Sequence, residues 1–146
     1  MKFIIPISAL IGTTLAAPPA QTAHLTFRSD PSTAAYKLTI VADGTTSTVD
    51  NNTPISLIDA PDYLARSLCK FDTVDKVEFS DTIAADNVTQ QVVLKPASVI
   101  RSVTCEGMCV GTYGNCYDDQ TGQPVGPCCN GLCAANRCRP WNIGQH

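Results

Sequence analysis

Histidine is scarce in this sequence: the 146 residues include only His24 and His146. A serine or cysteine nucleophile needs a neighbouring base, and histidine is the side chain that most often supplies it. Because both histidines lie near the ends of the chain, little is available for a Ser-His-Asp or Cys-His site. We therefore expect a protein that is not an enzyme and that uses no cofactor.

Carboxylate pairs and cysteine spacing do not indicate a catalytic or metal site either. Asp59 with Asp62, and Asp118 with Asp119, are close in sequence. Neighbouring acids of this kind in turns usually cap local backbone N–H groups and do not act as a catalytic dyad. The cysteines lack the paired C-x2-C spacing, or the partner histidines, of a zinc site. We expect no metal site.

Positive charge is also in short supply. Ten basic residues stand against thirteen acidic ones, for a formal net charge of −3, and no basic stripe is present. Such a chain is a poor ligand for nucleic acid or for an anionic membrane. We expect neither nucleic-acid binding nor membrane insertion.

Long apolar runs are absent after the N-terminus. There, Lys2 precedes the apolar run Phe3–Leu15, and small residues follow. The run is shorter than the roughly 20 residues that span a bilayer. This pattern predicts a signal peptide over residues 1–16, cleaved after Ala16, with Ala17 and Ala20 as alternative sites. The protein is expected to be secreted and extracellular.

Long amphipathic helices are missing as well, and short alternating segments take their place. Residues 63–71 fit a helical face or a strand, and we favour a strand; Asp43-Gly44 is typical of a hairpin turn. The other expected strands are 24–27, 36–41, 45–49, 55–58, 76–79, 88–95 and 98–105. Short, closely spaced strands rich in Thr and Val indicate a mainly β fold, a small antiparallel β-sandwich or barrel over residues 17–104.

Cysteine, by contrast, is abundant. There are eight, an even number that agrees with an oxidising compartment. Six fall between Cys109 and Cys138 with the spacing C-x6-C-x11-C-C-x3-C-x4-C. Six cysteines in thirty residues leave few apolar side chains for a core, so disulfides must hold this segment together. Six cysteines allow 15 pairings, and spacing alone does not select one.

The run PCCNGLC, residues 127–133, together with this spacing resembles the inhibitor cystine knot (knottin) family. The x11 gap is longer than usual for that family. The resemblance implies a disulfide-rich, cysteine-knot-like mini-domain over residues 105–146, in which cysteines one and four, two and five, and three and six are bonded. On this chain those pairs are Cys109–Cys129, Cys116–Cys133 and Cys128–Cys138.

Two cysteines, Cys69 and Cys105, remain outside that set and would then bond to each other. A swap, with Cys105 in the knot and Cys109 bonded to Cys69, stays open. The segments IDAPDY (58–63), CKF (69–71) and VTCEG (103–107) are similar to small secreted cysteine-rich proteins of filamentous fungi. Many of those proteins are treated as candidate effectors, so the resemblance implies a place of action outside the producing cell more than a chemistry, and an effector role in virulence is a hypothesis that agrees with it.

Three aromatic residues are the candidate binding residues: Tyr113, Tyr117 and Trp141. In a segment whose interior is mostly sulfur, such side chains are expected at the surface, where Tyr and Trp are common contact anchors. A disulfide-held loop at Tyr117–Pro127 loses little entropy on binding. Alternatively, Trp141 folds back and covers the β-domain.

The leading hypothesis is a secreted, monomeric, non-catalytic interaction protein that binds an extracellular protein or glycan target. A hydrolase inhibitor, of a protease or an amylase, is one alternative, and a cell-wall glycan-binding protein is another. Asn87-Val88-Thr89 and Asn51-Asn52-Thr53 are glycosylation sequons. Asn87 is the better acceptor because Pro54 follows the other sequon.

Overall fold

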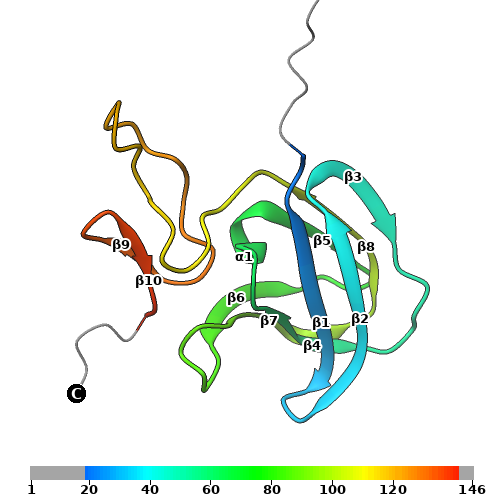
Figure 1. Ribbon diagram of the computed structural model, residues 1–146. Helices are drawn as coiled ribbons and strands as arrows, with labels where there is room; N and C mark the ends of the chain where they lie inside the picture. Colours follow the sequence, from blue (N-terminus) through cyan, green and yellow to red (C-terminus); the bar gives the residue numbers. More distant parts are fainter. Residues whose placement is uncertain (1–18, 142–146) are drawn as a thin grey trace, which may run out of the picture.

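A computed structural model describes residues 19–141 of the chain (Figure 1). The expected signal peptide, residues 1–16, and His146 lie outside the described residues. Within residues 19–141 the chain forms ten strands and one helical turn: β1 Thr22–Asp30, β2 Thr33–Val41, β3 Asp43–Thr48, β4 Ile55–Ala60, α1 Ala65–Leu68, β5 Cys69–Thr73, β6 Glu78–Ile83, β7 Gln90–Ser98, β8 Ile100–Glu106, β9 Leu132–Ala134 and β10 Arg137–Arg139. The mainly β fold class is confirmed.

Strands β1 to β8 form two antiparallel sheets. One has the order β2-β1-β4-β7-β6 and the other the order β3-β8-β5. The sheets pack over one core: Phe27 on β1 meets Phe71 on β5 with ring centroids 6.3 Å apart, edge to face. Of the two expected architectures the chain adopts an open sandwich, since the sheets do not close into a barrel.

The strands that are well predicted from the sequence are those in which buried and exposed side chains alternate. On β2, Ile40 is buried and Leu38 and Tyr36 are half-buried, while the residues between them are exposed. On β7, Val92 and Leu94 point into the core. A period of two places these apolar groups on one face of each sheet, so burial and backbone pairing favour the same conformation.

The expected hairpin at Asp43-Gly44 is wrong. Strand β2 pairs with β1, whereas β3 pairs with β8, so the chain passes from one sheet to the other at this point. Gly44 does have a positive φ of +87°, as a tight turn requires. The Asp43-Gly44 dipeptide marks a change of chain direction. The strand with which β3 pairs is determined by the core that β3 helps to bury.

The strand expected over residues 63–71 is correct only for its last part. Ala65–Leu68 makes one helical turn, and β5 begins at Cys69. The turn buries Ala65 completely and packs Leu64 and Leu68 against the core. The segment is therefore helical up to Leu68 and extended from Cys69, because only the residues from Cys69 onward pair with β8.

The C-terminal segment lies beside the sandwich (Figure 1) and contains the β9–β10 hairpin. Strand β8 continues through Cys105 to Glu106, so the expected boundary between residues 104 and 105 falls inside a strand. We use the name mini-domain for residues 107–141. A cysteine-rich mini-domain following the β-rich part is thus present.

Candidate functional site

Four disulfides join all eight cysteines. The three in the mini-domain are Cys109–Cys129, Cys116–Cys133 and Cys128–Cys138, the pairs that the knottin resemblance implies. Cys69 is bonded to Cys105, and the swapped alternative is not the arrangement found. The Sγ atom of Cys116 lies 3.7 Å from that of Cys138, so the sulfurs form the interior of the mini-domain.

The loop from Tyr117 to Pro127 is held by its own backbone. The N–H of Asp118 donates to the carbonyl of Gln123 (2.9 Å), and that of Val125 donates to Cys116 (2.7 Å). The carboxylate of Asp118 accepts the N–H groups of Thr121 and Gln120, and these two hydrogen bonds lower the pKa of Asp118 below its usual value. The loop therefore has a defined shape before any partner is bound.

Asn136 ties this loop to the β9–β10 turn. Its side-chain oxygen accepts the N–H of Tyr117, and its amide donates to the carboxylate of Asp119, both at 2.8 Å. Ala135 and Asn136 occupy the left-handed region, with φ of 52° and 57°, which closes the hairpin. One side chain thus fixes two neighbouring surface segments relative to each other.

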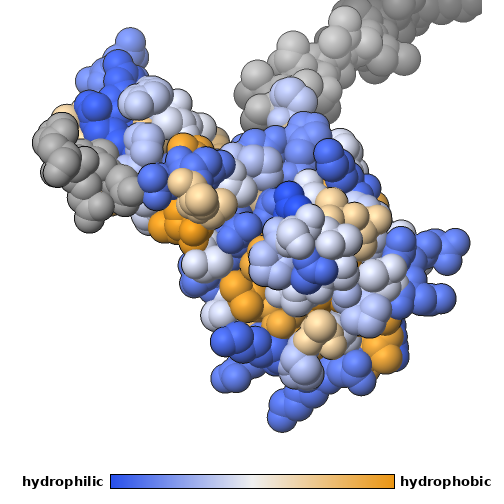
Figure 2. Space-filling model, turned by 90° about the horizontal axis from the view of Figure 1, so that it is seen from below, coloured by the Kyte–Doolittle hydropathy of each residue, from blue (hydrophilic) through white to orange (hydrophobic). Residues whose placement is uncertain are grey.

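Exposed apolar side chains concentrate on the mini-domain. Tyr113 is 63% exposed and Tyr117 is 46% exposed. We define the mini-domain surface as the exposed large apolar residues of this segment: Met108, Tyr113, Tyr117, Val125 and Leu132. In the described part of the sandwich only Val41, Val74 and Ile83 are comparable. Figure 2 shows apolar surface on the mini-domain close to its junction with the sandwich.

Trp141 does not belong to this surface. It lines a cavity of about 380 Å³ with Asp81, Thr82, Ile83 and Gln90, from β6 and β7. Of the three candidate binding residues, the two tyrosines stay exposed on the mini-domain, while the half-buried tryptophan faces β6 and β7 across this cavity. This position favours the alternative in which Trp141 folds back toward the β-domain.

Three hydrogen bonds join the mini-domain to the sandwich. The Tyr63 hydroxyl donates to the carbonyl of Gly107 (2.8 Å), and the Cys109 N–H donates to the side-chain oxygen of Gln21 (2.9 Å). The Asn130 amide donates to the carbonyl of Pro61. Burial, and then the charge of Glu106, raises the pKa of Tyr63. No periodic pattern marks such contacts, because each involves a single side chain and a distant backbone group.

Inside the mini-domain, a glycine allows the chain to pass close to β10. Gly131 has a φ of +119°, and a Cβ there would collide with the carbonyl of Arg139. The close approach of the chain to β10 therefore needs glycine at this position. The Asn-Gly dipeptide of the PCCNGLC run is explained by geometry within the mini-domain.

The carboxylates of Asp59 and Asp62 have different partners. Asp59 accepts from Arg28 Nε (2.7 Å) and from the Gln91 amide (2.8 Å), whereas Asp62 contacts His24 Nδ1 at 2.5 Å. Each acid is thus engaged in its own contact and the two do not share a site.

The sulfurs of Cys116, Cys128 and Cys138 lie within 4.8 Å of one another, but as disulfides they offer no thiolate to a metal.

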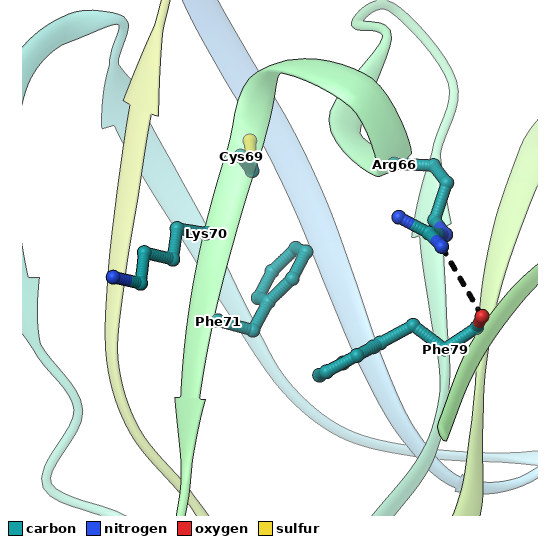
Figure 3. Close-up of a pocket in the computed structure, with 5 residues that line it drawn as sticks. All are labelled: Arg66, Cys69, Lys70, Phe71 and Phe79. Atoms are coloured by element: carbon teal, nitrogen blue, oxygen red, sulfur yellow. Dashed lines mark hydrogen bonds between the residues drawn. The ribbon is translucent and has the colours of Figure 1, made fainter. Parts of the chain in front are cut away.

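A separate cavity of about 280 Å³ lies between β5 and β6. It is lined by Arg66, Cys69, Lys70, Phe71 and Phe79. Figure 3 shows the rings of Phe71 and Phe79 pointing toward each other across the gap, and their centroids are 6.1 Å apart. Arg66 spans one end, where its Nη2 donates to the carbonyl of Phe79 (3.2 Å).

The two sequons differ in accessibility. Asn87 is exposed in the β6–β7 turn with a φ of 60°. Asn51 is half-buried, and its side-chain oxygen accepts the N–H of Thr53 at 2.9 Å. An exposed amide is available to a glycosyltransferase, so Asn87 is the better-placed acceptor.

Comparison with protein-family models, curated proteins and solved structures finds no match for this chain. Within residues 19–141, no helix has the length and hydrophobicity needed to cross a bilayer.

Proposed function

We propose that this protein is a secreted, non-catalytic interaction protein that binds an extracellular target through the mini-domain surface. The observation that carries the proposal is the exposure of Tyr113 and Tyr117 on a segment fixed by three disulfides. Aromatic anchors on a rigid support bind with little loss of conformational entropy. The disulfide pairing supports an inhibitor-cystine-knot type of scaffold.

Secretion is part of the proposal and rests on the N-terminal sequence together with the disulfides. Four disulfides within the described residues are suited to an oxidising compartment. The resemblance of the sandwich segments to small secreted fungal proteins adds the proposal that the protein is an effector. On this view the partner is a protein or a glycan met outside the producing cell.

The test is target capture from the extracellular fluid that the protein enters. The native protein is compared with a variant that carries Tyr113→Ser and Tyr117→Ser. The control is Val41→Ser on β2, because Val41 is as exposed as Tyr117, each at 46%. We expect the double variant to lose the captured partner and the control to keep it. Capture that is equal for all three proteins would refute the proposed surface.

A narrower form of this function is inhibition of a hydrolase. The Tyr117–Pro127 loop supports it, because backbone hydrogen bonds hold the loop in one conformation while Val125 is 42% exposed. Such a loop can occupy a cleft without first being ordered. A panel of extracellular proteases and amylases should contain an enzyme that the native protein inhibits and that Val125→Asp does not affect. A chitin or glucan pull-down distinguishes the glycan-binding alternative.

A further inference from the structure

Strand β5 is an unpaired edge of the three-stranded sheet. The order β3-β8-β5 gives β5 one neighbour, β8, and the 280 Å³ cavity lies on its other side, toward β6. An edge strand presents N–H and C=O groups that another strand can pair with. Among the described residues, none pairs as a strand with this edge.

The register shows which backbone groups of β5 face outward. Cys69 stands opposite Cys105 with a Cα–Cα distance of 4.0 Å, the short spacing of a pair that exchanges no hydrogen bonds. Phe71 and its partner Val103 are two residues further along and belong to the same class. The N–H and C=O of Phe71 therefore point away from β8, on the side of the 280 Å³ cavity.

The side chains that flank Phe71 carry opposite charges. Lys70 and Asp72 are exposed, and among the described residues neither has an ion-pair partner. Figure 3 shows Lys70 pointing away from the ring of Phe71, as alternation along a strand requires. The sequence Lys70-Phe71-Asp72 therefore places a basic and an acidic group on the outer face of the sheet, on either side of an outward-facing backbone unit.

We propose that β5 is a self-association edge at which a second copy of this chain pairs antiparallel about a two-fold axis at Phe71. In that arrangement Phe71 faces Phe71 of the second copy, and the two exchange both backbone hydrogen bonds. Lys70 then stands opposite the second copy's Asp72, and Asp72 opposite its Lys70. The same three residues satisfy both sides, as a two-fold interface demands, and the two three-stranded sheets join into one.

The other three edge strands of the sandwich, β2, β3 and β6, are not self-complementary in charge. Strand β2 carries one charged residue, Lys37, and β3 carries Asp43. Strand β6 carries two acids, Glu78 and Asp81, and the Arg66 side chain already occupies the Phe79 carbonyl. Within the bounds of these three strands, two copies meeting edge to edge bring no pair of opposite charges together, whereas two copies of β5 do.

The experiment is sedimentation equilibrium of the full mature chain from about 10 µM to about 1 mM, the range suited to a small interface. The native protein should pass from monomer to dimer. Lys70→Glu turns two attractive cross-strand pairs into repulsive ones. We expect this variant to raise the dissociation constant about thirtyfold, or about 2 kcal/mol at 1.4 kcal/mol per factor of ten.

Two single variants make the test specific. Lys70→Glu gives an edge with two acids, and Asp72→Lys gives an edge with two bases, so each should self-associate poorly. An equimolar mixture should form a heterodimer with nearly the native affinity, because every opposed pair is again of opposite charge. Lys37→Glu on β2 is the control and should dimerise like the native protein.

Three results would overturn the proposal: no dimer of the native chain at any concentration, undiminished dimerisation of Lys70→Glu, or no heterodimer in the mixture. Target capture through Tyr113 and Tyr117 uses a different surface and should be unaffected by Lys70→Glu. The two proposals can therefore fail independently.

Discussion

Removing the disulfide between Cys69 and Cys105 is expected to destabilise the protein without altering the mini-domain surface. The bond joins residues 36 apart in sequence and links adjacent strands β5 and β8. On the chain-entropy estimate, a loop of this length stabilises the native state by about 4 kcal/mol. For a domain of this size that corresponds to a fall in melting temperature of roughly 15 °C.

The variant is Cys69→Ala with Cys105→Ala, which leaves no unpaired thiol. Cys105 is fully buried, and alanine at that position introduces no polar atom into the core. Thermal unfolding followed by circular dichroism gives the shift, and disulfide mapping verifies that the other three bonds are intact. The native protein and the variant should capture the same partner at 20 °C.

The matched control removes Cys128 and Cys138, which are 10 residues apart. The same estimate gives about 3 kcal/mol, so the loss of global stability is similar, yet this bond lies in the interior of the mini-domain. We expect this second variant to lose partner capture even when the sandwich is folded. A melting temperature within about 3 °C of native for the first variant would refute the stability reasoning.

Three further predictions concern single side chains. Asn136→Gly keeps the positive φ and removes the acceptor of the Tyr117 N–H. Exchange of that amide hydrogen should rise by about tenfold or more, and unchanged exchange would show that Asn136 does not hold the loop. Hydrogen bonds, chiefly from the Thr121 N–H, lower the pKa of Asp118 from 3.8, so its contribution to stability is present above that value and lost as the pH falls through the lower folded-state pKa. Asp118→Asn should weaken this acid dependence in denaturant titrations below about pH 4, and an identical pH profile would count against it. Asn87→Asp should remove the glycan that mass spectrometry detects after expression in a eukaryotic secretory host, whereas a glycan retained on the variant would exclude Asn87 as the acceptor.

The strands were predictable where one face is buried. The spacing of Tyr36, Leu38 and Ile40, and of Val92 and Leu94, indicates a period of two and the inward face of each strand. This inference needs no knowledge of the partner strand. The pairing of strands was not predictable. Asp43-Gly44 has the local chemistry of a hairpin, but the strand that follows pairs with β8, about 60 residues later in the sequence. The register and the partner of a strand depend on burial between residues far apart in sequence. The residues of the strand alone do not determine them.

The candidate site was partly predictable for the same reason. Tyr113 and Tyr117 stay exposed because sulfur fills the interior beside them, and cysteine spacing is visible in the sequence. Trp141 is close to them in sequence, yet it is half-buried and lines a cavity with residues of β6 and β7. The contact of Tyr63 with Gly107 has no sequence signal, since one hydroxyl and one carbonyl make no pattern.

The sequence by itself determined the class of this molecule: a strand period of two, many cysteines crowded at the C-terminal end, and an acidic chain with few histidines. Tertiary structure alone decided which edges are free, which aromatic side chains remain exposed, and where Lys70 and Asp72 stand relative to the outward-facing backbone of Phe71. The physical reason is that burial periodicity is a local property of the chain. The neighbour of a strand or a side chain is instead set by the packing of all elements together.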